Sequence, residues 1–117
     1  MIVTEKNVED YLKGKVEAAG GMYIKIPAVY ATGIPDRLIL MPKGRVAFAE
    51  IKRPRGGRIA PIQKWWQEKL RSLGFIAEVV KNYDEADELV RRLTDEMDNS
   101  CRYARDSDVQ VYRVDSR

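Results

Sequence analysis

Apolar residues recur at helical spacing in three parts of the chain, which predicts three helices. The first is expected over residues 4–19, with Thr4 as its N-cap, and the others over 59–74 and 83–93. Glycines mark the ends of the first two helices. The apolar residues expected to face inward are Val8, Leu12, Val16 and Ala19 in the first helix, Ile59, Ile62, Trp66, Leu70 and Leu73 in the second, and Ala86, Leu89, Val90 and Leu93 in the third.

Short apolar runs between these helices predict four strands, over residues 22–26, 36–41, 45–52 and 75–80. The second and third strands flank the sequence Pro-Lys-Gly and are expected to form a hairpin. The order of one helix, three strands, a helix, a strand and a helix predicts an α/β fold, in which helices flank one small mixed sheet.

The predicted elements end near residue 93, so we expect one domain over residues 1–93 and a polar C-terminal extension over 94–117. The sequence contains neither an internal repeat nor a low-complexity tract that would suggest a second unit. Within the extension, residues 109–115 have the pattern of a short edge strand, and a mobile tail is the alternative.

Composition narrows the chemistry that the domain can perform. The 117 residues carry a net charge of +3, which weakly favours an anionic partner. The chain has no histidine and therefore lacks the usual zinc ligand, so any bound metal is expected to be a hard cation held by carboxylate and carbonyl oxygens. One cysteine, no apolar run of membrane-spanning length and no signal-peptide pattern together indicate a cytoplasmic protein.

The third predicted strand begins apolar and ends charged. Residues two apart on a strand share one face, so Glu50 and Lys52 are expected on the same face as Phe48. A carboxylate and an ammonium group at the end of an apolar strand indicate a functional site at the edge of the sheet. A simple salt bridge between Glu50 and Lys52 is the alternative.

Asp36 begins the preceding strand. If the two strands form a hairpin, Asp36 lies opposite the end of the third strand, and its carboxylate converges with that of Glu50. Two close carboxylates repel each other, and a divalent cation would offset that repulsion. Alternatively, Asp36 accepts a hydrogen bond from a turn amide or pairs with Arg37 or Arg53.

Two further polar residues lie near the predicted site. Glu5 falls within the apolar stripe of the first helix, where a buried carboxylate would need a partner, although an acid in the first turn also suits the helix dipole. Gln63 lies near the start of the second helix, where it could contact the end of the third strand or a phosphate. A glutamine that faces solvent is the alternative.

A basic, glycine-containing loop follows the third strand. The cations expected to contact a nucleic-acid backbone are Arg53, Arg55, Arg58 and Lys64. A solvated basic turn is the alternative for this loop. Trp65 lies beside the apolar stripe of the second helix, so it could pack at an interface, stack on a base or fill an imperfect core.

Six segments of the chain, taken in order, resemble a known nuclease family. They are TEKNVEDYL, GGMYIKIP, GIPDRLIL, GRVAFAEIKRP, APIQ and LGFIAEVV, and they cover most of residues 4–93. The Pro-Asp, Glu-x-Lys and Pro-x-Gln elements within them resemble the virus-type replication-repair nuclease domain, VRR-NUC, a branch of the PD-(D/E)xK nuclease superfamily.

The resemblance implies a restriction-endonuclease-like fold with an αβββαβ core. It also implies metal-dependent hydrolysis of phosphodiester bonds in DNA. The residues that match the family's site are Asp36 and Glu50 as metal ligands, Lys52 as the catalytic lysine, Glu5 as the acid of the first helix and Gln63 as the glutamine of the second helix.

The expected cofactor is Mg²⁺ or Mn²⁺, for which the backbone carbonyl of Ile51 could join the two carboxylates as a third oxygen ligand. Stand-alone members of the family look like homodimeric Holliday junction resolvases, which implies a homodimer that cuts branched DNA. A less selective nuclease acting on flaps or single strands is one alternative. A nucleic-acid-binding module without catalysis is the other.

Overall fold

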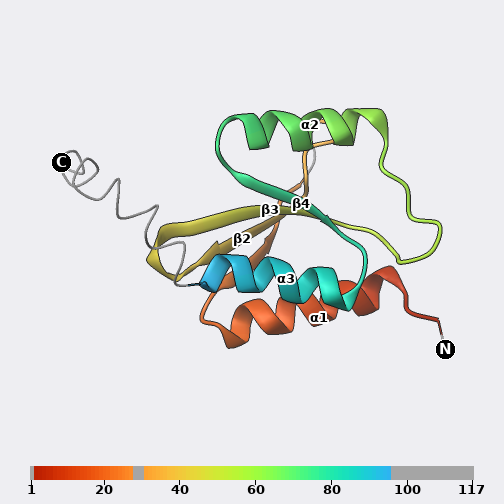
Figure 1. Ribbon diagram of the computed structural model, residues 1–117. Helices are drawn as coiled ribbons and strands as arrows, with labels where there is room; N and C mark the ends of the chain where they lie inside the picture. The colour runs from red at the N-terminus through yellow and green to blue at the C-terminus, as the bar shows by residue number, and fades with distance from the viewer. Residues whose placement is uncertain (1, 28–30, 96–117) are drawn as a thin grey trace.

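The computed structural model describes residues 2–27 and 31–95, which form a four-stranded sheet with helices on both faces (Figure 1). The elements in chain order are α1 (Glu5–Ala18), β1 (Met22–Lys25), β2 (Arg37–Met41), a 3₁₀ turn (Pro42–Gly44), β3 (Arg45–Ile51), α2 (Pro61–Ser72), β4 (Ile76–Val80) and α3 (Tyr83–Thr94). These bounds confirm the predicted helices and strands to within two residues. The strand considered for residues 109–115 lies outside the described residues.

The sheet has the order β1-β2-β3-β4 and is mixed, as predicted. Neighbouring strands are antiparallel from β1 to β3, and β4 is parallel to β3. A parallel pair needs a crossover connection, and α2 provides it on one face, while α1 and α3 cover the other (Figure 1). In the described part of the chain, no helix has the length and apolar composition needed to cross a membrane.

The core lies between the sheet and the pair α1 and α3. In the predicted inward stripe of α1, Val8, Leu12 and Val16 are fully buried, as expected, whereas Ala19 is only partly buried. Alternate strand residues complete this core from the sheet side, because successive side chains point to opposite faces. The buried side chains of this layer include Val8, Leu12 and Val16 of α1, Ile39 of β2, Ala47, Ala49 and Ile51 of β3, and Ala86, Leu89 and Leu93 of α3.

The predicted inward face of α2 is correct in part, since Leu70 is buried, as expected, and Ile59 and Trp66 are partly buried. The expectation that Ile62 and Leu73 face inward is wrong, because their side chains are 44% and 61% exposed. Gln67 is buried instead, next to Leu70 on the helix face that packs mainly against β4. Trp65 is 51% exposed, so it does not fill the core. Polar contacts at the start of α2, described below, hold the helix in this orientation.

Candidate active site

Asp36 and Glu50 face each other where β2 meets β3. The hairpin register pairs Arg37 with Ala49. One step further along the register, Asp36 lies opposite Glu50. The carbonyl oxygen of Asp36 accepts a hydrogen bond from Ile26 N at 2.8 Å on the β1 side, so Asp36 and Glu50 form a closely spaced pair without hydrogen bonds between them. Their side chains therefore leave the sheet on the same face, toward α2.

Glu50 is a buried carboxylate in this arrangement. The residue is 7% exposed, and burial together with the negative charge of Asp36 raises its pKa to about 6. Oε2 of Glu50 accepts a hydrogen bond from Gln63 Nε2 at 3.2 Å and lies 3.8 Å from Lys52 Nζ. The salt bridge that the sequence left open is thus present, but it does not offset the burial of the charge. Additional positive charge at this site would therefore be stabilising.

Ile51 contributes a carbonyl oxygen that faces away from β4. The amide of Lys52 donates to the Val80 carbonyl at 3.0 Å, so the polar backbone groups of Lys52 point to β4 and those of Ile51 point to the β2 side. Continued by two residues beyond the Arg37–Ala49 pair, the register would place Ile51 opposite Pro35, which has no N–H to donate. Among residues 2–27 and 31–95, no three Asp, Glu, His or Cys side chains form a metal-binding group. The candidate oxygen donors are therefore two carboxylates and this carbonyl.

Arg37 holds Asp36 from the other side of the sheet. Nη1 of its guanidinium group lies 2.8 Å from Asp36 Oδ1, and its Nε donates a hydrogen bond to Glu9 Oε2 at 2.7 Å. Tyr23 also donates to Glu9 Oε2, at 3.4 Å. The pairing of Asp36 with Arg37 that the sequence left open does occur, and it leaves Asp36 beside Glu50. The contact with Glu9 was not foreseen, although Arg37 shares a strand face with buried Ile39, where a charged residue requires an anionic partner.

Gln63 joins the start of α2 to Glu50. Its Oε1 accepts a hydrogen bond from Ala60 N at 2.9 Å, while its Nε2 donates to Glu50. The first contact is one half of a capping box, in which an N3 glutamine satisfies the amide of the N-cap residue. The alternative that Gln63 faces solvent is wrong. A helix end thus fixes the orientation of the buried carboxylate.

Glu5 lies in the first turn of α1 and is exposed. This position suits the helix dipole. Its negative charge also contributes to the raised pKa of Glu50, after the larger effects of burial and of Asp36. Glu5 is therefore within electrostatic range of the site without being part of a cluster of ligands.

The four cations expected to contact a nucleic-acid backbone are of two kinds. Arg53 folds back on the loop, where its Nε donates to the Arg55 carbonyl at 2.7 Å and its Nη2 to the Gly56 carbonyl at 3.4 Å. The side chains of Arg55, Arg58 and Lys64 are exposed and form no hydrogen bond or ion pair with any residue that the structure describes. Arg53 shapes the loop, and the other three cations remain available to a partner.

The loop that carries Asp36 is anchored on α2. Trp66 Nε1 donates to the Thr32 carbonyl at 3.0 Å. Gly33 adopts a positive φ of 86° and packs so closely on Ile62 that an added Cβ would lie 2.7 Å from the isoleucine side chain. Glycine is required here for its conformation and for its small size. The same helix therefore positions both carboxylates, Glu50 through Gln63 and Asp36 through this loop.

The substitution Gly33→Ala is expected to lower the stability of the protein and the nuclease activity that the sequence resemblance implies. The new methyl group overlaps Ile62, and overpacking of this kind costs about 1–3 kcal/mol in the free energy of unfolding. Gly44→Ala is the matched control, because Gly44 also has a positive φ, of 74°, but has no atom within 4 Å of an added Cβ. Chemical denaturation and a cleavage assay on both variants separate the clash from the backbone strain. Equal losses in the two variants would show that the contact with Ile62 does not matter.

Known proteins are similar to this chain over most of its length. No family model matches it. The protein "Putative nuclease p44" of Acyrthosiphon pisum secondary endosymbiont phage 1 is 31% identical over 83 residues, which are 71% of this chain and 88% of that protein. A solved structure described as "VRR_NUC domain" superposes with a TM-score of 0.69 at 31% identity, over 74% of this chain and 94% of that one. Both similarities extend over most of this chain and most of the other protein, and they confirm the family expected from the motifs. The chain belongs to the VRR-NUC nuclease family.

Proposed function

We propose that this protein is a divalent-metal-dependent endonuclease that cuts branched DNA as a homodimer. The observation that carries the proposal is the position of Asp36 one residue before the Arg37–Ala49 pair, where its charge acts on Glu50, with Lys52 Nζ 3.8 Å from Glu50 Oε2. Two carboxylates that face a phosphate would weaken the binding of DNA by repulsion, so a protein that only binds DNA gains nothing from them. With an adjacent ammonium group, the pair favours metal-dependent hydrolysis of a phosphodiester.

The donor atoms of the site suit Mg²⁺ or Mn²⁺. The carboxylates of Asp36 and Glu50 and the carbonyl oxygen of Ile51 are hard ligands, which these ions prefer. Burial and the charge of Asp36 raise the pKa of Glu50, and a cation between the two carboxylates would reverse that effect. When bound, such an ion lowers the pKa of water and neutralises negative charge on the phosphoryl oxygens.

The residues around the carboxylates position the reacting groups. Lys52 would place a fixed positive charge beside the scissile phosphate, where it orients the attacking water or stabilises the charge of the transition state. Gln63 holds Glu50 in one orientation through its hydrogen bond, and so reduces the freedom that the site must lose during the reaction. Glu5 is suited to holding a water molecule at the edge of the site.

The cations beside the site favour recognition of DNA structure. Arg55, Arg58 and Lys64 are suited to phosphates, which are the same in every sequence, so they position DNA without reading its bases. Two copies of the domain would supply the two active sites that symmetric cutting of a junction requires. The exposure of Trp65 favours a second candidate, a nuclease for flaps or single strands, because an exposed indole can stack on an unpaired base.

The test is cleavage of a synthetic four-way junction, with a flap and a plain duplex of the same sequence as controls. Each substrate is incubated with Mg²⁺, with Mn²⁺ and with EDTA. We expect paired symmetric nicks in the junction, which disappear in EDTA and in the variant Asp36→Asn. Asp84→Asn, an exposed substitution at the start of α3, controls for the loss of one charge.

Each outcome of this experiment selects one function. Cleavage of flaps or single strands in place of junctions would keep the site and select the second candidate. Tight binding of DNA without cleavage in either metal would select the non-catalytic binding module. Full activity of Asp36→Asn would contradict the assignment of the site.

A further inference from the structure

A groove between α1 and β1 lies beside the candidate active site and contains none of the residues assigned to catalysis. Its volume is about 390 Å³, and its lining residues are Lys6, Glu9, Asp10, Lys13, Tyr23 and Lys25. Lys25 is the last residue of β1 and pairs with Arg37, the immediate neighbour of Asp36. The groove therefore begins near the backbone of Asp36, on the face of the sheet opposite the Asp36 and Glu50 side chains, and extends along α1.

The acidic groups of the groove are paired within the protein. Glu9 accepts a hydrogen bond from the buried Arg37 at 2.7 Å, and Asp10 accepts one from Lys6 at 3.1 Å. Lys13 and Lys25, by contrast, are exposed. Neither forms a hydrogen bond or an ion pair within the described part of the chain, and Lys25 acts on Glu9 only at longer range. Two uncompensated ammonium groups therefore face one concave surface.

We propose that this groove binds the sugar-phosphate backbone of DNA at a distance from the phosphate that is cut. This inference rests on the proposed function, and it assigns a second contact surface to the same substrate. Ammonium groups bind phosphates as point charges, and their contacts release counterions from DNA. The positions of Lys6 and Lys13 give the length of the groove along α1: they are seven residues apart, about 10 Å along the helix axis. That length exceeds a single phosphate ion and suits successive phosphates of one strand.

The location of the groove supports this partner. The loop with Arg55 and Arg58 leads from the end of β3 to α2 (Figure 1). The groove is lined by residues of α1 and β1, on the face of the sheet that α1 covers. The N-terminal end of α1 and this loop lie at the same end of the sheet (Figure 1). Cations on both sides of the carboxylates would hold DNA across the site, rather than at one side of it.

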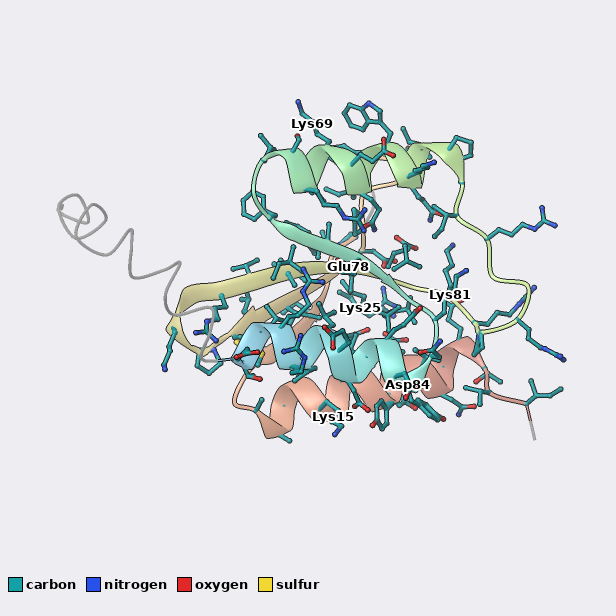
Figure 2. All side chains as sticks on the ribbon, viewed as in Figure 1. Lys15, Lys25, Lys69, Glu78, Lys81 and Asp84 are labelled. Carbon is teal, nitrogen blue, oxygen red and sulfur yellow. The ribbon has the colours of Figure 1, made fainter. Side chains whose placement is uncertain are left out.

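The test measures binding without cleavage. The affinity for a junction and for a duplex is determined in EDTA over a range of salt concentrations, for Lys13→Gln, Lys25→Gln and the double variant. Each lost phosphate contact is expected to reduce the slope of log K against log salt concentration by about 0.9, and the double variant by about twice that amount. Lys69→Gln is the control, because Lys69 lies on α2, on the opposite face of the sheet from α1 (Figure 2). Its slope should match that of the unchanged protein.

The outcomes separate this inference from the proposed function. An unchanged slope in the double variant would overturn the groove as a DNA contact, whether or not the protein cleaves DNA. An equal reduction in Lys69→Gln would overturn it too, since the effect would then come from net charge. Failure of cleavage in every metal, with the predicted loss of slope, would support the groove and contradict the nuclease. Since the three substituted side chains are exposed, circular dichroism should show that every variant folds.

Discussion

Glu50→Gln is expected to abolish cleavage and, at the same time, to stabilise the metal-free protein at neutral pH. The catalytic loss should be at least about 10³-fold, because the substitution removes a carboxylate that no other residue of the proposed site replaces. The gain in stability has a separate cause. Glutamine carries no charge into the buried position, and its carbonyl oxygen can still accept the hydrogen bond from Gln63.

The pH dependence of this gain follows from the direction of the pKa shift. Burial and Asp36 raise the pKa of Glu50 from 4.5 to about 6, so the folded protein binds this proton more tightly than the unfolded chain does. The contribution of Glu50 to stability is therefore most favourable below pH 4.5 and is lost as the pH rises through 6. At pH 7.5 the variant should be more stable by on the order of 2 kcal/mol, and at pH 4 the two proteins should differ little.

Denaturant unfolding in EDTA at both pH values, with a junction cleavage assay, measures the two effects. Glu78→Gln is the matched control in a neighbouring strand, because Glu78 accepts hydrogen bonds from Arg71 at 3.2 Å and Arg92 at 2.8 Å. Removal of the Glu78 carboxylate should lower the free energy of unfolding slightly and leave cleavage intact. A Glu50→Gln variant that is no more stable than the unchanged protein at pH 7.5 would show that the buried negative charge of Glu50 does not destabilise the folded protein.

Arg37→Leu should destabilise the protein more than any surface substitution. Arg37 is 7% exposed, and its loss leaves the carboxylates of Glu9 and Asp36 without their shared cation. Removal of one partner of a buried ion pair costs about 3–5 kcal/mol, and the partial exposure of both acids places this variant near the lower value. Cleavage should fall as well, since Asp36 loses the contact that orients it.

A double-mutant cycle with Glu9→Gln isolates the pair. If the cost comes from an unpaired charge, Glu9→Gln combined with Arg37→Leu should be more stable than Arg37→Leu alone. Arg37 lowers the pKa of Glu9 from 4.5, so the stability that the pair supplies is present above pH 4.5 and lost as the pH falls through the lowered pKa. Lys6→Leu, which breaks an exposed pair with Asp10, should change stability little. Independent, additive effects of the two substitutions would contradict the coupling.

The bounds of the elements could be predicted because they follow from local patterns. The stripe of Val8, Leu12 and Val16 is fixed by helical periodicity, and the hairpin follows from two apolar runs around a short turn. The register of that hairpin, continued by one residue, also places Asp36 opposite Glu50. Asp36 and Glu50 thus belong to one local hairpin, so their position opposite each other could be predicted from the sequence.

The remaining contacts join distant segments, and no local pattern records them. Glu9 meets Arg37 from 28 residues away, and Trp66 meets Thr32 from 34 residues away. The second contact helps to set the rotation of α2, and the apolar stripe alone, which predicted Leu70 correctly, missed the burial of Gln67. A charged residue at a buried strand position was the one available signal, and it indicated that Arg37 had a partner without naming Glu9.

The first turn of α2 shares one side chain with the candidate site, since Gln63 bonds both Ala60 and Glu50. Helix termini fray more readily than helix centres, because their backbone groups have fewer partners. Each time this turn unwound, Gln63 would leave the backbone, and Glu50 would lose the amide that orients it. The fraction of molecules with an ordered carboxylate would then be limited by the fraction in which this helix end is wound. In this protein, the fraying of a helix terminus would regulate how often the active site is complete.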